Sequence, residues 1–431
     1  MLHSNLCVNE KGHLTFAGLD TVELCNTYKT PLMLLDTGRI KNKMRLYLNA
    51  IKKHFSENSF ACYASKALSI KEIYNIAKSE NFGIDVVSSG EIYTAKCVGF
   101  PLKNALFHGN NKTDEDISYA IESGIGYFVV DNVEELLEVN KQAKEIGKIQ
   151  NILIRITPGI DPHTHAKIST GQVDSKFGTP IETGQAFEIT SIALNLENVS
   201  LKGFHCHVGS QCFDSSAFIS AVKIMLTFIR DVKNLFGYET EILNLGGGYG
   251  VRYVESDPEI DIEKNIEEVA KVFKETCKNL NIKEPAVIME PGRSIVADSG
   301  LTLYTAGSFK TIDGYKSYVS IDGGMTDNPR YTLYGSSYTV LNASKADKEP
   351  DVTATIAGRC CESGDLIQED VLIKKPIRGD IIAVLVTGAY NYAMASNYNR
   401  IPRPPIVAVE NGSAKIIVKR ESFEDLTRNE I

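Results

Sequence analysis

The 431-residue sequence predicts an eight-stranded parallel barrel of alternating strands and helices, a (β/α)8 barrel, together with a mainly antiparallel β domain. Three observations predict this architecture. Eight short apolar runs recur along the middle of the chain, helical patterns separate them, and after about residue 300 the pattern changes to alternating, turn-rich segments. Continuous rather than alternating hydrophobicity is typical of parallel strands that are covered on both faces.

The eight apolar runs are the predicted barrel strands, because a polar or glycine-rich turn closes each of them. In order, they are FACYAS from Phe60, GIDVVS from Gly83, NALFHG from Asn104, GYFVVD from Gly126, NILIRIT from Asn151, LKGFHCHVGS from Leu201, EILNLGGG from Glu241 and PAVIMEPG from Pro285. The stretches between them have helical spacing, as where Ile70, Ile73, Ile76 and Ala77 fall on one face. A doubly wound sheet is the alternative, but it would be large, and its first strand lacks a GxGxxG turn.

The domain boundaries follow from the change of pattern. The barrel is assigned to 37–300, and the β domain to 1–36 together with 301–431. An amphipathic helix from Ile40 to Phe55 precedes the first barrel strand, and a strand-like PLMLLD segment precedes that helix. The N-terminal strands are expected to join the antiparallel strands of the C-terminal part.

Composition excludes several classes of partner. The net charge of −8, with both signs interspersed, argues against a nucleic-acid surface. No apolar run reaches 18 residues, so no membrane span is expected, and the N-terminus lacks the pattern of a signal peptide. Nine cysteines without a CxxC pair predict neither a disulfide framework nor a zinc site. A cytoplasmic protein is therefore expected.

Polar residues gather where the predicted strands end, and this is the end of a barrel at which active sites lie. They are Lys66, Asp85 with Ser88, His108, Asp131, Arg155, His205 with His207, Gly246 to Gly248, and Glu290 with Arg293. Any one of them alone is more often a solvated strand end. Together they place an amine, carboxylates, imidazoles and a glycine loop around one rim, which predicts a functional site.

Two glycine turns indicate what this site binds. LNLGGGYG ends the seventh strand and MEPGRS ends the eighth, the two positions at which barrels often bind phosphate. A phosphate site and a strand-end lysine favour pyridoxal phosphate held by Lys66 as a Schiff base. Glu290 is suited to keep the pyridine nitrogen protonated, and His207 to stack on the ring. His205, expected to point the opposite way on the same strand, is interpreted as a core histidine.

The motifs that carry a family resemblance are YASKAL, DVVSSGEI, HGNNK, HCHVGSQ, NLGGGYG, MEPGRSIVADSG, DGGMTDNPR, CCESGD and GAYNYAMASNYN. They run in order from about Pro31 to Arg403, and their combination is highly specific. The sequence resembles the ornithine/diaminopimelate/arginine decarboxylases, which are fold type III, alanine-racemase-like pyridoxal-phosphate enzymes, and among them the diaminopimelate decarboxylases.

The resemblance implies roles for individual residues. The catalytic residues are expected to be Lys66, His207 and Cys361, the last as proton donor to the carbanion left by CO2. The expected cofactor contacts are Lys66, Asp85, His207, Ser210, Gly247, Gly248, Glu290, Pro291, Gly292, Arg293 and Tyr390. The expected substrate contacts are Arg293, Arg330, Tyr334, Glu362 and Tyr390. The resemblance also implies that three residues reach into a partner subunit's site, namely Cys361, Glu362 and Tyr390. A homodimer is therefore expected. Cys360 has no assigned role.

The distal end of the substrate distinguishes the members of this family. Ornithine and arginine carry a distal cation, for which an acidic pocket is suited, whereas diaminopimelate carries a second amino-acid head. Arg293 and Arg330 can each fork onto a carboxylate, and Glu362 can take the ammonium beside it. This combination favours decarboxylation of meso-2,6-diaminopimelate to L-lysine and CO2. The alternatives are a decarboxylase of ornithine, lysine or arginine, a racemase, a non-catalytic pyridoxal-phosphate-binding regulator, and a cofactor-free barrel hydrolase.

The DPHTHAKISTGQVDSKFG segment after the fifth strand contains His163 and His165. An HxH pair without carboxylate or cysteine partners nearby is weak evidence for a metal, and none is predicted. The segment resembles the family's mobile loop, which is expected to exclude water from the active site.

Overall fold

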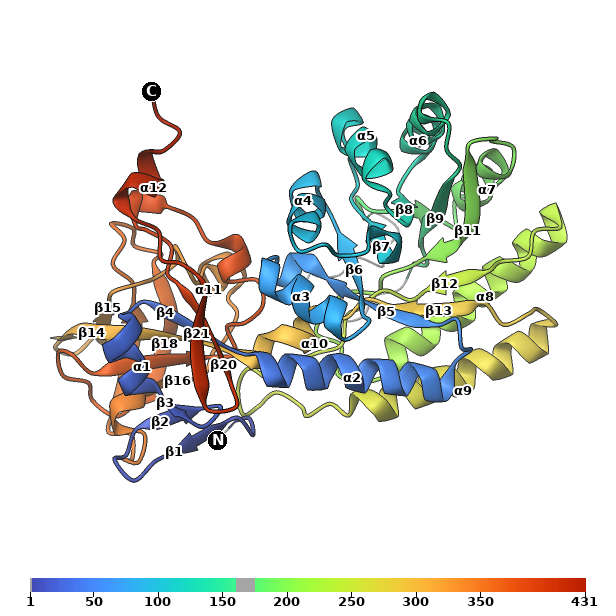
Figure 1. Ribbon diagram of the computed structural model, residues 1–431. Helices are drawn as coiled ribbons and strands as arrows, with labels where there is room; N and C mark the ends of the chain where they lie inside the picture. Colours follow the sequence, from blue (N-terminus) through green and yellow to red (C-terminus); the bar gives the residue numbers. More distant parts are fainter. Residues whose placement is uncertain (1, 160–174) are drawn as a thin grey trace. The chain divides into compact units, whose positions relative to one another are not determined.

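The computed structural model describes residues 2–159 and 175–431 (Figure 1). The chain forms two compact units. The barrel unit comprises 41–250 and 259–294, and the β unit comprises 1–40, 251–258 and 295–431. Residues 251–258 thus group with the β unit, although they lie inside the 37–300 range assigned to the barrel from the sequence.

The barrel unit contains all eight predicted strands, each paired in parallel with its neighbours. They are β5 (Phe60–Ala64), β6 (Gly83–Val86), β7 (Ala105–Phe107), β8 (Tyr127–Val130), β9 (Gln150–Thr157), β11 (Val199–His205), β12 (Ile242–Asn244) and β13 (Ala286–Met289). The sheet closes on itself because β13 pairs with β5, with Ile288 opposite Phe60. The predicted (β/α)8 barrel is confirmed. A short additional strand, β10 (Thr179–Pro180), pairs with β9.

Helices connect the strands (Figure 1). They are α2 (Thr37–His54) before β5, then α3 (Lys71–Ser79), α4 (Ser89–Cys97), α5 (Asp114–Ser123), α6 (Val133–Ile146), α7 (Gln185–Leu194), α8 (Ser216–Phe236) and α9 (Ile262–Leu280), with the 3-10 turns η1 (Ser65–Ala67) and η2 (Leu102–Asn104). The helical spacing seen in the sequence is confirmed in α3, which buries Ile73, Ile76 and Ala77. Among the helices of the described residues, none is both long and apolar enough to cross a membrane.

The interior of the barrel contains an apolar cluster. One buried cluster draws a residue from each of six strands, namely Cys62, Leu106, Val129, Leu153, Ile242 and Ile288. Side chains from six strands of one closed sheet can meet only inside it, so this cluster fills the interior, as in other packed barrels. The polar residues of the predicted site lie at the carboxyl ends of the strands.

The β unit is a mixed, mainly antiparallel sheet, with the strand order β18-β17-β15-β14-β4-β20-β21. Its strands are β4 (Leu32–Asp36), β14 (Gly300–Ile312), β15 (Lys316–Ile321), β16 (Val340–Asn342), β17 (Val352–Ala357), β18 (Leu366–Ile373), β19 (Ile381–Leu385), β20 (Ile406–Glu410) and β21 (Ser413–Val418). β19 pairs with β14 and β16. Two pairs, β20 with β4 and β15 with β17, are parallel. The expectation that N-terminal strands join this sheet is confirmed only for β4.

The other N-terminal strands, β1 (Leu6–Val8), β2 (Leu14–Phe16) and β3 (Leu19–Asp20), form a separate antiparallel sheet. The β unit is completed by short helices and 3-10 turns: α1 (Thr21–Tyr28), α10 (Arg293–Val296) at its boundary with the barrel unit, η4 (Ala297–Ser299), α11 (Arg330–Tyr334), η5 (Ala343–Lys345), η6 (Tyr392–Met394), η7 (Tyr398–Arg400) and α12 (Phe423–Thr427).

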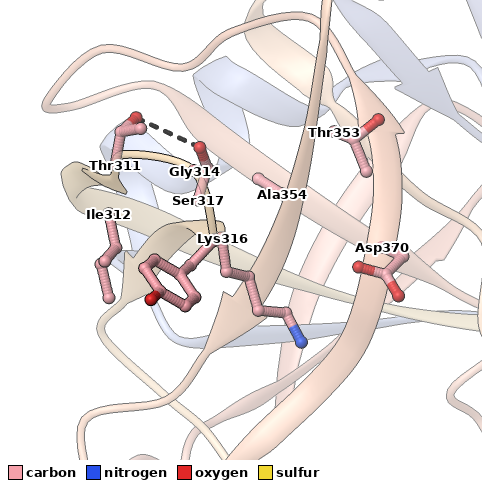
Figure 2. Close-up of a pocket in the computed structure, with 9 residues that line it drawn as sticks. Thr311, Ile312, Gly314, Lys316, Ser317, Thr353, Ala354 and Asp370 are labelled. Carbon is pink, nitrogen blue, oxygen red and sulfur yellow. Dashed lines mark hydrogen bonds between the residues drawn. The ribbon is translucent and has the colours of Figure 1, made fainter.

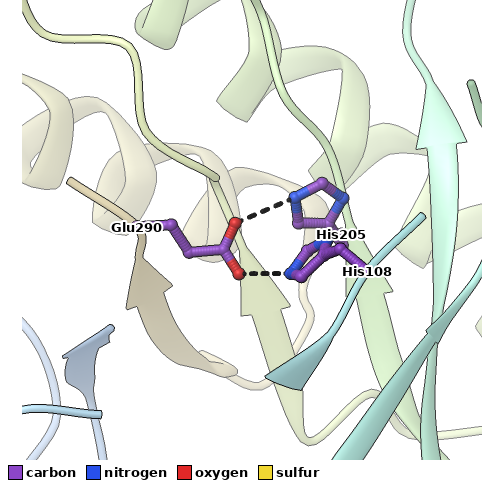
Figure 3. A group of neighbouring side chains, drawn as sticks. All are labelled: His108, His205 and Glu290. Atoms are coloured by element: carbon purple, nitrogen blue, oxygen red, sulfur yellow. Dashed lines mark hydrogen bonds and ion pairs between the residues drawn. The ribbon is translucent and has the colours of Figure 1, made fainter. Parts of the chain in front are cut away.

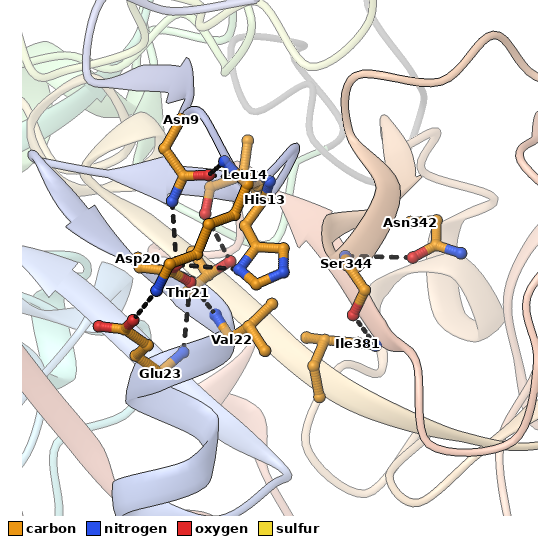
Figure 4. A network of polar contacts seen from close by, with 11 residues as sticks. Asn9, His13, Leu14, Asp20, Thr21, Val22, Glu23, Asn342, Ser344 and Ile381 are labelled. Carbon is orange, nitrogen blue, oxygen red and sulfur yellow. Dashed lines mark hydrogen bonds and ion pairs between the residues drawn. The ribbon is translucent and has the colours of Figure 1, made fainter.

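Asp20 ties the small N-terminal sheet to the start of α1 (Figure 4). One carboxylate oxygen accepts hydrogen bonds from the N–H groups of Val22 and Glu23, at 2.9 and 3.2 Å. The other accepts from Asn9 Nδ2 and lies 2.9 Å from His13 Nδ1. Burial opposes ionisation, but these hydrogen bonds outweigh it and lower the pKa of Asp20 below its ordinary value.

Replacing Asp20 by alanine is expected to lower the free energy of unfolding by about 1 to 3 kcal/mol, because the helix loses its cap and Asn9 loses its acceptor. Thermal unfolding at neutral pH measures the loss, with Asp20→Asn as the matched control that keeps the cap. A carboxyl group whose pKa is lower in the folded than in the unfolded chain stabilises the fold at any pH above its unfolded pKa. This stabilisation is lost as the pH falls through the folded pKa. The difference between Asp20→Ala and the wild type should therefore shrink in acid, and a difference independent of pH would contradict this role.

Candidate active site

Lys66 lies in η1, directly after β5, and its side chain is exposed rather than buried. The strand end beneath it is fixed by two hydrogen bonds, from Ala64 N–H to the carbonyl of Pro291 at 3.1 Å and from Leu68 N–H to the carbonyl of Ser65 at 3.0 Å. The positive charge of Lys66 acts on the pKa values of Asp85 and His207, which places the amine among the polar groups at the barrel rim.

The glycine turn after β12 passes through a space in which no side chain fits. A Cβ on Gly247 would lie 2.1 Å from the carbonyl oxygen of Glu290, and one on Gly248 would lie 2.4 Å from that of Gly209. Gly246 has a φ of +68°, and its Cβ would lie 2.9 Å from His207 Nδ1. Backbone therefore passes close to the turns after β11 and β13, which is the arrangement that allows N–H groups to approach an anion.

Glu290 follows β13 and is buried, with three polar partners from other strand ends. His108 Nε2 lies 2.8 Å from its Oε1, and Asn244 Nδ2 donates to the same oxygen at 2.7 Å. His205 Nε2 lies 3.3 Å from Oε2 (Figure 3). Burial alone would raise the pKa of Glu290, but the two imidazoles hold it well below its ordinary value. Glu290 is therefore an anion.

The prediction that His205 points away from the site is wrong. His205 is buried, like the core histidine that was expected, but its Nε2 faces Glu290. Residues two apart on a strand point to the same face, so the spacing of His205 and His207 gives no reason to assign them to opposite sides. His108 and Asn244 also received no role from the sequence. Only their positions at strand ends could have suggested one.

His207 lies just beyond β11 and is half-buried. Burial, followed by the positive charges of Lys66 and Arg155, lowers its pKa well below the ordinary value. A neutral imidazole presents a flat face without a charge to solvate, which suits it to lie against an aromatic ring.

Glu91, in the first turn of α4, is a rim carboxyl that sequence reasoning missed. Its Oε2 accepts the N–H of Val87 at 2.7 Å. Burial raises its pKa to about 7, although that hydrogen bond and the charge of Lys66 oppose the rise. Its position at a helix start gives the ordinary sequence signal of a capping residue, which explains the omission.

Ser210 and Arg293, both predicted to contact the cofactor, lie side by side in the barrel unit. The Ser210 hydroxyl accepts a hydrogen bond from Arg293 Nε at 3.1 Å, and Arg293 is buried. Helix α2 fixes the next residue of this turn, because the Tyr47 hydroxyl lies 2.7 Å from Ser294 Oγ and Lys43 Nζ donates to the Ser294 carbonyl at 2.9 Å. The EPGRS turn is thus rigidly positioned.

In the β unit, Arg330 is buried between two predicted substrate residues. Its guanidinium lies 5.3 Å from the ring centre of Tyr334 and 5.7 Å from that of Tyr390. Nη2 donates to Ser336 Oγ at 3.1 Å, while buried Nε has no hydrogen-bond partner among the described residues. Tyr390 has a φ of +60°, a strained backbone conformation for a tyrosine. The aromatic walls hold the guanidinium ready for an anionic partner.

The CCESGD loop separates its two cysteines. Asp365 is buried and accepts the N–H groups of Cys360 and Met325, at 2.7 and 2.6 Å. Burial and the Asp365 carboxylate raise the pKa of the Cys360 thiol to about 12. Cys361 is exposed, and its N–H donates to Asn399 Oδ1 at 2.7 Å. Glu362 is also exposed. The loop therefore presents Cys361 and Glu362 outward and keeps Cys360 in a structural position.

A cavity of about 340 Å³ lies by the β14–β15 hairpin (Figure 2). Tyr315, 90% exposed, and Lys316 line it, but Lys316 already pairs with Glu369 at 2.5 Å. No predicted site residue lines this cavity, and among its polar lining residues Thr311 and Ser317 already pair with each other.

The residues at the barrel rim fit pyridoxal phosphate. The side-chain-free turn at Gly246 to Gly248 can cradle a phosphate, the Glu290 anion can pair with a protonated ring nitrogen, and neutral His207 can lie against the ring. The exposed amine of Lys66 is available to the aldehyde. His163, His165 and most of the predicted mobile loop lie outside the described residues.

Comparisons with known proteins agree with this chemistry. Residues 37–297 match the family model described as "Pyridoxal-dependent decarboxylase, pyridoxal binding domain". The chain is 44% identical to a diaminopimelate decarboxylase of Bacillus methanolicus, over 97% of each chain. It is 42% identical to that of Bacillus subtilis (strain 168), over 99% of this chain and 97% of the other.

A solved structure extends the likeness to three dimensions. The diaminopimelate decarboxylase from M. jannaschii, in co-complex with L-lysine, superposes with a TM-score of 0.92 at 35% identity, over 100% of this chain and 99% of the other. The chain belongs to the pyridoxal-dependent decarboxylase family and, within it, to the diaminopimelate decarboxylases.

Proposed function

We propose that this chain uses pyridoxal phosphate to remove one carboxyl group of meso-2,6-diaminopimelate, giving L-lysine and CO2. The observation that carries the proposal is the near full-length likeness to diaminopimelate decarboxylases, one of them in complex with L-lysine. The rim of the barrel unit supplies the groups that the cofactor needs, and the β unit supplies an arginine suited to the second amino-acid head of the substrate.

The barrel unit would hold the cofactor. When bound, pyridoxal phosphate supplies an electron-accepting ring that takes up the charge left at Cα as CO2 departs. Lys66 would anchor it through its amine. The phosphate would lie on Gly247, Gly248, Ser210 and the turn from Pro291 to Arg293, with Asp85, Glu290 and His207 around the ring and Tyr390 as a further contact.

Substrate recognition rests on charge. Arg330, between Tyr334 and Tyr390, would fork onto the distal carboxylate, and Arg293 would take a carboxylate in the same way. Glu362 would accept the distal ammonium. A substrate with only an amine at its distal end leaves the buried charge of Arg330 unpaired, which disfavours ornithine and lysine.

Cys361 would donate the proton to Cα after CO2 leaves. Its exposure, and that of Glu362, suits residues that enter a partner subunit's site, so the proposed working unit is a homodimer. All nine cysteines are free thiols, as expected in the reducing cytoplasm, where we place the reaction.

The direct test is CO2 release from meso-diaminopimelate by the purified chain, with and without added pyridoxal phosphate. Lysine should accumulate in step with CO2, and removal of the cofactor should abolish both. Ornithine, lysine and arginine serve as competing substrates. Faster CO2 release from one of them, or racemisation without CO2, would replace the proposed reaction by the corresponding alternative.

Changing Arg330 to leucine should raise KM for diaminopimelate about 10- to 100-fold, because a charge-assisted hydrogen bond to the distal carboxylate is lost. Steady-state kinetics measures the change, and the absorbance of the bound cofactor checks that cofactor binding is retained. Arg330→Lys is the matched control: it keeps the charge but not the fork, so its KM should be intermediate. An unchanged KM in Arg330→Leu would remove Arg330 from the substrate site.

A further inference from the structure

We infer that His108, His205 and Asn244 are positioning residues that together fix the Glu290 carboxylate with a single acceptor position left open, on Oε2, for the ring nitrogen of the bound cofactor. This inference rests on the proposed function, because it assigns the residues that orient the carboxylate facing the ring. It concerns side chains from three other strand ends, none of which received a role from the sequence.

The geometry carries the inference. His108 follows β7, His205 ends β11 and Asn244 ends β12, and all three converge on Glu290 after β13. Figure 3 shows the two histidines at the Glu290 carboxylate. An ionised carboxylate has about four acceptor positions. Oε1 uses two, for His108 at 2.8 Å and Asn244 at 2.7 Å, whereas Oε2 uses one, for His205 at 3.3 Å. Counted over residues 2–159 and 175–431, the remaining position lies on Oε2, so this oxygen is the one that receives a fourth donor.

Each donor is itself held in place. Asn244 is fully buried, and its Oδ1 accepts the N–H of Gly246 at 2.8 Å, so its amide must present Nδ2 to Glu290. The rings of His108 and His205 meet edge to face, with centres 4.8 Å apart and planes at 72°. Asn244 thereby connects the Glu290 carboxylate to the glycine turn at Gly246.

The proton of His205 can be assigned from its surroundings. Burial lowers its pKa to about 3, so the imidazole is neutral. Its Nδ1 is buried and has no hydrogen-bond partner among the described residues. A bare lone pair is the less costly group to leave in that position, so the proton lies on Nε2 and is donated to Glu290. His205 therefore fixes the carboxylate without adding a positive charge that would repel the cationic ring nitrogen.

Asp85, the neighbouring carboxyl group, differs from Glu290 in its hydrogen bonds and in its charge. Asp85 Oδ1 lies 3.9 Å from His108 Nε2 and has no hydrogen bond among the described residues. Burial raises the pKa of Asp85, and the Glu290 anion raises it further. Because Glu290 has three donors and Asp85 has none on that oxygen, the negative charge facing the ring belongs to Glu290.

A metal ion is the competing interpretation of the same three side chains. The ligand atoms of His108, His205 and Glu290 all lie within 4.8 Å of one another. Two ligands of one tetrahedral zinc ion are separated by about 3.3 Å, given bonds of about 2.0 Å. The 2.8 Å between His108 Nε2 and Glu290 Oε1 is shorter and is an ordinary hydrogen-bond distance. Asn244, which is not a usual zinc ligand, also occupies the oxygen that the ion would need.

The test uses holoenzyme that carries a cofactor labelled with 15N at the ring nitrogen. Its 15N chemical shift reports ring protonation without reference to turnover, and equilibrium dialysis gives the cofactor dissociation constant. His205→Leu and His108→Leu should each bind the cofactor about 10- to 100-fold more weakly and should shift the ring nitrogen towards the deprotonated value. His205→Gln and His108→Gln are the matched controls, because a glutamine amide places a donor near Nε2, and both should stay close to wild type.

Wild-type affinity and ring protonation in both leucine variants would overturn the inference. If those variants do not fold, 15N-histidine spectra of the wild-type holoenzyme decide: His205 must carry its proton on Nε2 alone, and a doubly protonated or Nδ1-protonated ring would overturn it. If the wild type bound one equivalent of Zn²⁺ and both leucine variants lost this binding, a metal site would replace the inferred positioning role. CO2 release by wild type tests the proposed function separately, so a failed inference leaves that function standing.

Discussion

Replacing Lys66 by alanine is expected to lower kcat for meso-diaminopimelate by about 10⁴-fold or more, which is a rise of about 5.5 kcal/mol in the activation barrier. In the proposed function, Lys66 would hold the cofactor through its amine, and it is the only residue of the η1 turn that carries an amine side chain. Alanine leaves this turn without a group that could bind the aldehyde. CO2 release under saturating substrate measures the effect.

The fold should survive this change, since the Lys66 side chain is exposed and the turn is held by backbone hydrogen bonds at Ala64 and Leu68. Lys71→Ala is the matched control, because Lys71 is an exposed lysine five residues away at the start of α3. It should turn over like wild type. Wild-type turnover by Lys66→Ala, with its circular dichroism unchanged, would end the assignment of Lys66.

Much of the barrel could be predicted from the sequence because its signals are local. Each strand is a short apolar run closed by a turn, and each turn places polar residues at the functional end of the barrel. Lys66, Asp85 and Glu290 could therefore be placed at one rim before their contacts were known. The separate sheet formed by β1 to β3 was not predicted, although its strands follow one another within residues 6–20, because strands of two or three residues are too short to show a recognisable alternation.

The hydrogen-bond partners of Glu290 could not be predicted from local sequence patterns. His108, His205 and Asn244 are 182, 85 and 46 residues from Glu290. The sheet order β11-β12-β13 brings His205 and Asn244 to Glu290, and closure of the barrel through β13 and β5 brings His108 there. The two adjacent cysteines of the CCESGD loop likewise differ in burial because Asp365 folds the loop back onto Cys360. Neither arrangement is encoded in the spacing of the residues involved.

Changing Cys361 to alanine is expected to lower kcat by about 10²- to 10⁴-fold, the usual cost of removing a positioned proton donor. KM for diaminopimelate should change little, because in the proposed reaction the thiol would act only after CO2 has left. Cys360→Ala is the matched control: its thiol lies beside Asp365, which together with burial raises its pKa to about 12 and makes it a weaker acid, so its loss should cost no more than a few-fold. Equal losses in the two variants would indicate a structural role for the loop.

Mixing the two inactive variants, Lys66→Ala and Cys361→Ala, tests whether each site is built from two subunits. In a mixed dimer with shared sites, one site receives both altered residues and the other receives neither. Random exchange makes about half of the dimers mixed, so activity should return to about a quarter of wild type. If Lys66 and Cys361 acted within one chain, every site would carry one defect and no activity would return. Because Cys361 is exposed on a loop of the β unit and Lys66 is exposed at the barrel rim, the recovery measures directly whether a second subunit supplies the proton donor.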